Sequence, residues 1–275
     1  MENKISIFGG TGFIGKKFCN LYPDETVVIS RESREPQTNQ VLYFISTTHN
    51  YHVFTDPFLD IETNLSVLIQ TLQECKDRDV VFNFVSSWFV YGDCKLPVKE
   101  NTPCNPRGFY SITKKCAEDL LISYCQTFKI PYRIFRLGNI YGPEYKDASK
   151  KKNALQYMIN CLKNNDPISL YHSGEFIRDY MHVDDVARAL HLLIEKSPVD
   201  SIFNVGSGIP VRMKDIINEA VTLLSSKSKI ESIDSPEFHK TVQVRDMYLD
   251  VSKLKNLGFQ QKISLNEGIR ELCLS

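Results

Sequence analysis

The sequence lacks the residue patterns that mark several common classes of protein. Its eight cysteines are scattered and none forms a Cys-x-x-Cys pair, so neither a zinc site nor a disulfide framework is indicated. The six histidines show no metal-ligand spacing, and the His-Glu-x-x-His pattern of zinc proteases is absent. We therefore expect no metal site in this protein.

Long apolar runs and an excess of charge are missing as well. No segment reaches the roughly 20 apolar residues that a membrane-spanning helix needs. Lys+Arg and Asp+Glu both number 33, and a formal net charge of zero gives no field that would attract nucleic acid or an acidic membrane. A strand pattern begins at Lys4 and leaves no room for a signal peptide. We expect a cytoplasmic protein with no nucleic-acid or membrane partner.

Apolar, strand-like runs alternate with helical patterns through the first half of the chain. The strand-like runs cover residues 5–8, 26–29, 41–45, 80–85 and 132–136, and the helical patterns cover 13–21, 62–75 and 110–128. Because the runs are apolar throughout, they predict a parallel sheet buried on both faces. Only about ten residues separate the second run from the third, too few for a full crossover, so the sheet should be trimmed there.

The pattern changes after Leu137. Glycine, proline, asparagine and lysine become frequent, and the later strand candidates, 168–170 and 202–205, are short. We expect an α/β, Rossmann-like doubly wound parallel sheet with a small interleaved C-terminal lobe. Residues 1–138 plus 183–205 would form the dinucleotide-binding domain, and residues 139–182 plus 206–275 the substrate lobe.

A glycine-rich loop joins the first strand-like run to the first helical pattern. Gly10-x-Gly12-x-x-Gly15 follows a strand and opens a helix, which is the context in which this fingerprint binds a dinucleotide. The glycines permit a tight turn and a close approach of the pyrophosphate to backbone N–H groups at the helix N-terminus. The expected cofactor contacts in this loop are Gly9, Gly12, Phe13, Ile14 and Gly15.

The residues after the second strand-like run bear on the choice of cofactor. An acidic side chain there would bind the ribose 2′-hydroxyl of NAD, but the chain has Ser30 and Arg31, followed by Arg34. Arginine can pair with the 2′-phosphate of NADP, and serine can hydrogen-bond to it. Alternatively, this is a solvated loop whose arginines meet neighbouring glutamates. The residues favour NADP(H), with NAD(H) as the alternative.

A Tyr110-x-x-x-Lys114 pair begins the helical pattern 110–128. Positions i and i+4 share one face of a helix, so the Lys114 ammonium can sit near the Tyr110 hydroxyl. A nearby cation favours the phenolate, and we expect it to lower the pKa of Tyr110 from about 10. Such a tyrosine can donate or accept a proton near neutral pH. Together with the dinucleotide loop, the pair implies hydride transfer at a carbinol or carbonyl carbon.

Several motifs in combination resemble the extended short-chain dehydrogenase/reductase family, which contains nucleotide-sugar epimerases, dehydratases and ketoreductases. The resemblance covers nearly the whole chain, from Lys4 to about Ile269. It is carried by the glycine loop, the Tyr-Lys pair and the segments 86–92, 136–143, 178–185 and 204–208. It implies a place in the biosynthesis of surface or conjugated carbohydrates.

The resemblance also implies roles for three side chains. Ser87 would hydrogen-bond the substrate oxygen at the carbon that gains or loses hydride, and Tyr110 would exchange a proton with that oxygen. Lys114 would lower the pKa of Tyr110 and hold the nicotinamide ribose. The family commonly dimerises through the helices that match residues 62–75 and 110–128, packed as a four-helix bundle, so a homodimer is expected.

For the substrate, the resemblance implies donors suited to the diphosphate of a nucleotide sugar. Asn139 and Asn153 offer amide groups, and Arg178 and Arg245 offer guanidinium groups that match phosphate geometry. Alternatively, Arg178 forms a structural ion pair and Arg245 lies on the surface. Thr47 follows the third strand-like run, where the family places residues beside the nicotinamide and its ribose.

Trp88 and Phe89 are the main departure from the family pattern. The 4,6-dehydratases of this family carry Asp-Glu there to move protons during water loss, which two aromatics cannot do. Small residues are common there in 4-epimerases, whose sugar has to rotate. Trp88 and Phe89 can line the substrate site and pack against the methyl group of a 6-deoxy sugar, or one or both can face the core.

These observations favour an NADPH-dependent ketoreductase that acts on a nucleoside-diphosphate 4-keto-(6-deoxy)hexose, with Tyr110 as proton donor. A nucleotide-sugar 4-epimerase with tightly bound NAD would use the same Ser87, Tyr110 and Lys114 and is the alternative. A non-catalytic dinucleotide-binding regulator would not need these three side chains together. The residues do not distinguish uridine, deoxythymidine, guanosine and cytidine carriers.

Overall fold

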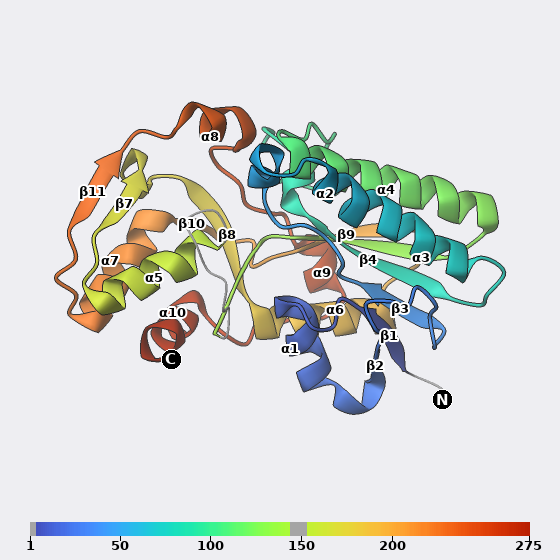
Figure 1. Ribbon diagram of the computed structural model, residues 1–275. Coiled ribbons are helices and arrows are strands. Elements are labelled where there is room, and N and C mark those ends of the chain that lie inside the picture. Colours follow the sequence, from blue (N-terminus) through green and yellow to red (C-terminus); the bar gives the residue numbers. More distant parts are fainter. Residues whose placement is uncertain (1–3, 144–152) are drawn as a thin grey trace.

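The computed structural model describes residues 4–143 and 153–275, and its centre is a parallel six-stranded sheet (Figure 1). The strand order is β2-β1-β3-β4-β5-β9. The strands are β1 (Ile5–Phe8), β2 (Thr26–Val28), β3 (Gln40–Tyr43), β4 (Val81–Ser87), β5 (Tyr132–Leu137) and β9 (Ser201–Val205). In the described residues only β2 lies beyond β1, which confirms the trimmed edge expected from the short connection between β2 and β3.

Helices cover both faces of this sheet. One face carries α1 (Phe13–Leu21) and α6 (Val183–Lys196), and the other carries α3 (Val67–Cys75) and α4 (Phe109–Phe128) (Figure 1). The central strands are therefore buried on both sides, which is why their sequences are apolar throughout. This arrangement confirms the Rossmann-like class.

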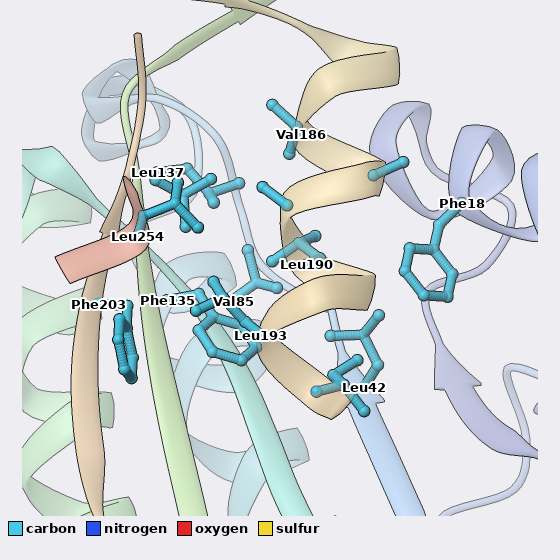
Figure 2. Packing of buried hydrophobic residues seen from close by; sticks show 14 of the residues in the cluster. Phe18, Leu42, Val85, Phe135, Leu137, Val186, Leu190, Leu193, Phe203 and Leu254 are labelled. Carbon is cyan, nitrogen blue, oxygen red and sulfur yellow. The ribbon is translucent and has the colours of Figure 1, made fainter. Parts of the chain in front are cut away.

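Figure 2 shows the core on the α1 and α6 side. Leu190 and Leu193 of α6 face the sheet, where Phe135 of β5 meets them, and Phe18 of the neighbouring α1 packs beside α6. All four side chains are completely buried. Truncating one such aromatic side chain to alanine costs about 3–5 kcal/mol, so this core holds the strand ends in fixed positions.

The helix expected over residues 62–75 starts earlier and is interrupted. It comprises α2 (Phe58–Ile61), a π-helical turn η3 (Glu62–Ser66) and then α3. The wider π turn changes the helical phase. Asp60 of α2 and Asn64 of the π turn are both buried, and Asn64 donates a hydrogen bond to Thr113 of α4. Such turns are frequent at functional sites.

A smaller group of elements stands beside the parallel sheet, on the left in Figure 1. It contains a three-stranded sheet in the order β10-β8-β6 and a two-stranded sheet of β11 and β7. The elements are β6 (Asn139–Tyr141), α5 (Ala154–Asn164), β7 (Ile168–Tyr171), β8 (Ile177–His182), β10 (Pro210–Arg212), α7 (Met213–Leu224), β11 (Ile230–Ile233), α8 (Glu237–Val242) and α10 (Leu265–Leu274).

The chain passes repeatedly between the two groups of elements. After β8 it returns to the parallel sheet through α6 and β9, and α9 (Ser252–Asn256) then packs on β9. Leu254 of α9 belongs to the core of Figure 2, although it falls in the range expected for the substrate lobe. The exact division into two domains stays a prediction. None of the helices in the described ranges is both long enough and apolar enough to span a membrane.

Candidate active site

A cavity of about 970 Å³ lies at the carboxyl ends of β1, β3, β4 and β5. From the parallel sheet it is lined by the glycine loop and by strand-end residues such as Ser46 and Ser87. From the smaller group of elements it is lined by residues such as Tyr171, Arg178 and Met213. Ligands of open parallel sheets bind at this edge, so the fold itself marks the cavity as the candidate site.

The glycine loop forms one end of the cavity. The Gly12 N–H donates to the Gly9 carbonyl at 3.0 Å, and Gly9 has a φ of +84°, a conformation that suits glycine. A Cβ on Gly15 would collide with the Gly9 carbonyl. α1 begins at Phe13 with Gly12 as an N-cap that offers no side chain. This bare helix N-terminus fits the pyrophosphate of a dinucleotide. All the expected contacts of this loop line the cavity: Gly9, Gly12, Phe13, Ile14 and Gly15.

The arginines after β2 occupy two different environments. The Arg34 guanidinium donates to the carbonyl groups of Arg31 at 2.7 Å and Ser33 at 2.9 Å, and to the Gln70 side chain at 3.2 Å. Arg34 therefore braces the turn. Ser30 and Arg31 are exposed at the edge of the sheet, beside rather than among the residues that line the cavity.

Ser87, Tyr110 and Lys114 come together on the cavity wall. Ser87 ends β4, and Tyr110 lies in the first turn of α4, where its hydroxyl hydrogen-bonds those of Ser87 and Ser46. Lys114 follows one turn later and is buried, with its ammonium 4.2 Å from the centre of the Phe84 ring. The structure thus places the three expected catalytic side chains in one site.

The electrostatics of this site differ from the expectation. Burial raises the pKa of Tyr110 to about 12, and the hydrogen bonds from Ser87 and Ser46 offset this only in part. Burial also lowers the pKa of Lys114 to about 7, against the opposing charge of Glu118. The expectation that Lys114 holds the pKa of Tyr110 below its usual value is wrong for the polypeptide by itself. The apolar surroundings penalise the charged forms of both side chains.

Trp88 and Phe89 follow Ser87 in the short helix η4 (Trp88–Val90) and take different positions. Trp88 is 2% exposed and belongs to a buried apolar cluster. Phe89 is half-buried and packs edge-on against Tyr110, with ring centres 5.9 Å apart. The Trp88 and Phe89 rings stack with their centres 3.9 Å apart, and the Arg178 guanidinium lies 5.3 Å from the centre of the Trp88 ring. Both residues line the cavity, and the largely buried Trp88 supports the Phe89 ring.

Two asparagines expected at the substrate site also line the cavity. Asn139 donates to the carbonyl of Asp179 at 3.2 Å. Asn153 is the N-cap of α5, and its side-chain oxygen accepts from the Gln156 N–H at 3.3 Å. Among the described residues its buried Nδ2 has no hydrogen-bond partner, so this amide retains a donor for a ligand.

The two arginines expected at the substrate site are not brought together. Arg178 lines the cavity and donates to the carbonyl groups of Ile177, Val244 and Arg245, and burial lowers its pKa. In the described part of the chain its hydrogen-bond acceptors are thus backbone carbonyls. The Arg245 side chain is 78% exposed and lines a separate hollow of about 350 Å³.

A set of buried polar side chains behind Tyr110 was missed by the sequence analysis. Asn50 accepts hydrogen bonds from the backbone N–H of Tyr110 at 2.9 Å and of Ser111 at 3.4 Å, which caps α4 from a distant segment. Asn64 accepts from Ser46 Oγ at 3.0 Å and from the backbone N–H of Thr47 at 2.9 Å. For Asn64 the available signal was a polar residue in the helical pattern 62–75, four positions before the inward-facing Leu68, whereas Asn50 lies outside the helical patterns.

Comparison with known proteins identifies a family that this chain matches. Residues 40–206 match the model of the NAD dependent epimerase/dehydratase family. A trifunctional UDP-glucose 4,6-dehydratase/UDP-4-keto-6-deoxy-D-glucose 3,5-epimerase/UDP-4-keto-L-rhamnose-reductase of Arabidopsis thaliana is 26% identical over 243 residues. The match covers 86% of this chain and 35% of that protein, so the chain spans about a third of the length of this relative.

Two solved structures have the same fold. The UDP-glucose 4-epimerase of Thermotoga maritima, with UDP-glucose, superposes with a TM-score of 0.88 at 22% identity and covers 98% of this chain and 97% of its own. RMD from Pseudomonas aeruginosa, complexed with NADPH, superposes with a TM-score of 0.86 at 20% identity, and the match covers 99% of this chain and 98% of the RMD chain. At these identities the likeness establishes the fold alone.

Proposed function

Since the chain belongs to the NAD-dependent epimerase/dehydratase family, we propose that it is a ketoreductase for the 4-keto group of a nucleoside-diphosphate hexose, most suitably a 6-deoxy sugar. A nicotinamide cofactor held by the glycine loop would supply the hydride to the carbonyl carbon. Tyr110 gives its hydroxyl proton to the carbonyl oxygen, and Ser87 orients that oxygen. One ketone, one NADPH and one proton thus yield one alcohol and one NADP⁺.

The observation that carries this proposal is the aromatic wall beside Tyr110. Phe89 is fixed between the Trp88 ring and the Tyr110 ring, so neither position offers a group that moves protons during elimination of water. The same wall restricts the space in which a sugar would turn to present its other face. A pKa of about 12 keeps Tyr110 protonated at neutral pH, which suits a proton donor.

We propose NADPH as the cofactor. The glycine loop would hold the pyrophosphate, and Tyr110, Lys114 and Thr47 would contact the nicotinamide ribose. Arg31 is exposed where the 2′-phosphate of NADP would approach the edge of the sheet, and Ser30 can hydrogen-bond the same group. RMD, which has the same fold, was solved with NADPH. Another protein of this fold was solved with NAD, which is the alternative cofactor.

A nucleotide-sugar 4-epimerase with tightly bound NAD is the second candidate. It is favoured by the structural likeness to UDP-glucose 4-epimerases and by the fact that Ser87, Tyr110 and Lys114 would serve it equally. An epimerase first oxidises its substrate, which requires the deprotonated form of Tyr110. The raised pKa of Tyr110 opposes that step at neutral pH.

The two candidates differ in cofactor consumption. We expect purified protein to oxidise NADPH in the presence of UDP-4-keto-6-deoxy-D-glucose or its dTDP counterpart, with one NADPH consumed per sugar alcohol formed. Tyr110→Phe should abolish this turnover but retain NADPH binding. Interconversion of UDP-glucose and UDP-galactose with no net change in nicotinamide absorbance would overturn the proposal in favour of the epimerase.

We further propose that the protein is a homodimer joined through α3 and α4. Exposed apolar side chains lie along the outer surface of this helical layer: Phe58, Ile61, Ile112, Leu120 and Phe128. Ile112 and Leu120 are two turns apart on α4 and share one face. Pairing with a second copy would bury them in a four-helix bundle. Size-exclusion chromatography with light scattering should give twice the chain mass of 31.6 kDa.

A further inference from the structure

A carboxylate lies buried directly behind the active-site cavity. Asp60, in the short helix α2, has no exposed surface, and its Oδ1 accepts a hydrogen bond from the hydroxyl of Thr47. The same oxygen lies 3.4 Å from Nδ1 of His52, while Oδ2 has no hydrogen-bond partner in residues 4–143 and 153–275. Removing a carboxylate from water is costly when the charge is not fully compensated, so a structural hydroxyl or amide would fill this place at lower cost.

Asp60 is connected to Tyr110 through three side chains. Thr47 Oγ1, which donates to Asp60, accepts a hydrogen bond from Asn64 Nδ2 at 2.8 Å. Asn64 Oδ1 accepts from Ser46 Oγ at 3.0 Å, and Ser46 hydrogen-bonds the Tyr110 phenol. An amide does not release and take up protons at this step, so the chain of contacts is no proton relay. The hydrogen bonds instead fix the position of the Tyr110 side chain relative to the Asp60 carboxylate.

Two ionisable side chains lie near the Tyr110 phenol. Lys114 follows one turn later on the same helix, with Glu118 one turn behind it, but burial lowers the pKa of Lys114 to about 7, so it is largely uncharged in the alkaline range where the phenol titrates. Burial is the main cause of the raised pKa of Tyr110, and the Asp60 carboxylate of α2, with His52 of η2 (Asn50–Phe54) behind it, adds a smaller effect in the same direction. Among the described residues, Arg178 of β8 also lies near this wall, where its guanidinium contacts the Trp88 ring that stacks on Phe89.

We propose that Asp60, held by Thr47 and His52, is a further functional group of the active site whose fixed negative charge keeps the Tyr110 phenol in its proton-donating form. The inference rests on the proposed function, because reduction of a carbonyl group requires the protonated phenol, whereas oxidation of an alcohol requires the phenolate. Asp60 acts on the substrate through Tyr110 and is thus a positioning residue. Its effect is to keep the Tyr110 hydroxyl protonated well into the alkaline pH range.

The test removes the charge while preserving the shape. Asp60→Asn keeps an oxygen that accepts from Thr47, and the pH dependence of kcat/KM is measured for NADPH-dependent reduction of UDP-4-keto-6-deoxy-D-glucose. We expect kcat/KM to begin its decline at alkaline pH (the alkaline limb) about one pH unit lower than in the parent protein. At pH values below this decline, kcat should change less than about threefold. The matched control is Asp56→Asn, which removes an exposed carboxylate from the same segment and should leave the limb in place.

An unmoved alkaline limb in Asp60→Asn would overturn the inference and leave Asp60 with a structural role. If Asp60→Asn does not fold, Thr47→Val replaces it, because loss of this hydroxyl weakens the support of the carboxylate charge. It should shift the limb in the same direction by a smaller amount, and no shift would again overturn the inference.

A second measurement needs no sugar substrate. In protein labelled with ¹³C at tyrosine Cζ and saturated with NADPH, the Tyr110 signal is identified by its loss in Tyr110→Phe and followed against pH. A lower midpoint in Asp60→Asn than in the parent protein supports the inference, and equal midpoints overturn it. If the parent protein reduces no 4-keto sugar nucleotide while this midpoint shifts, the proposed function fails and the role of Asp60 in setting the charge at Tyr110 stands.

Discussion

The two ends of the active-site cavity are built by different means. At the cofactor end, the glycine loop provides backbone N–H groups, and the close contact between Gly15 and Gly9 leaves no room for a side chain. Behind Tyr110, the buried side chains of Asp60 and Asn64 are joined by hydrogen bonds through Thr47, and Asn50 separately accepts hydrogen bonds from the backbone of α4. The glycine loop depends on the absence of side chains, and the region behind Tyr110 depends on hydrogen-bonded polar side chains. Substitutions in the two regions should therefore impair different properties of the protein.

The difference between the regions also separates binding from chemistry. A backbone cradle recognises a pyrophosphate whatever reaction follows. The side-chain network touches Tyr110 through Ser46 and through the first turn of α4, and therefore acts on proton transfer. Changes in the loop should weaken cofactor binding, whereas changes in the network should alter turnover while cofactor affinity remains.

Gly15→Val should have the largest effect, because it breaks the backbone region outright. The added side chain meets the Gly9 carbonyl, which cannot move without opening the turn. We expect NADPH affinity to fall by about tenfold to a hundredfold, measured by isothermal titration calorimetry. A thermal melt checks that the variant is folded. Folded Gly15→Val with unchanged NADPH affinity would contradict the placement of the pyrophosphate in this loop.

Lys114→Met should stabilise the protein while removing its activity. Burial lowers the pKa of Lys114 from 10.5 to about 7, so between these pH values the unfolded chain binds a proton that the folded chain does not. Stability therefore rises with pH across this window, and at pH 7 the lysine is a net cost. We expect the free energy of unfolding at pH 7 to increase by on the order of 2 kcal/mol, measured by urea denaturation. A variant less stable than the parent at pH 7, with an unaltered pH dependence, would contradict this.

Arg31→Ala should change cofactor preference without affecting the loop or the network. We expect NADPH affinity to fall about tenfold, with NADH affinity unchanged, because a single charge-assisted contact to the 2′-phosphate is lost. Arg78→Ala is the matched control, since Arg78 pairs with Glu35 on the same edge of the protein. A parent protein that prefers NADH, with Arg31→Ala having no effect, would move the epimerase or an NAD-dependent oxidase of a sugar nucleotide to first place.

The same contrast explains which parts of the molecule could be predicted from the sequence. The glycine loop and the Tyr110–Lys114 pair are local patterns, and the helix and strand that carry them follow from apolar periodicity. Asn50 caps a helix that begins about 60 residues later, and Asp60 meets Thr47 across a turn of the chain. Such contacts depend on the tertiary fold, which brings distant polar residues together, and local sequence spacing does not predict them.

The pKa of Tyr110 was mispredicted for a related physical reason. The i to i+4 spacing correctly places Lys114 near Tyr110, but spacing carries no information on how deeply both groups are buried. Burial lowers the charge on Lys114 and disfavours the phenolate at once. The wall formed by Phe89 could be suggested from its place after Ser87, whereas its packing between Trp88 and Tyr110 required the structure.

Asn50→Ala should produce the smallest effect and the sharpest distinction between the two regions. The N-cap residue of α4 is Gly108, which has no side chain, so Asn50 supplies the acceptor for the backbone N–H groups of Tyr110 and Ser111. Its loss should cost about 1 kcal/mol in the free energy of unfolding and lower kcat several-fold, with NADPH affinity unchanged. Asn50→Asp keeps the acceptor and should restore much of kcat.

The control for this prediction is a helix cap far from the cavity. Ser264 caps α10 together with Glu267, and Ser264→Ala should cost a similar free energy of unfolding. If both variants lose the same stability but only Asn50→Ala loses kcat, the cap supplied by Asn50 positions Tyr110 for proton transfer. Equal losses of kcat in both would mean that turnover merely follows global stability, and the proposed division between a binding region and a proton-transfer region would not hold.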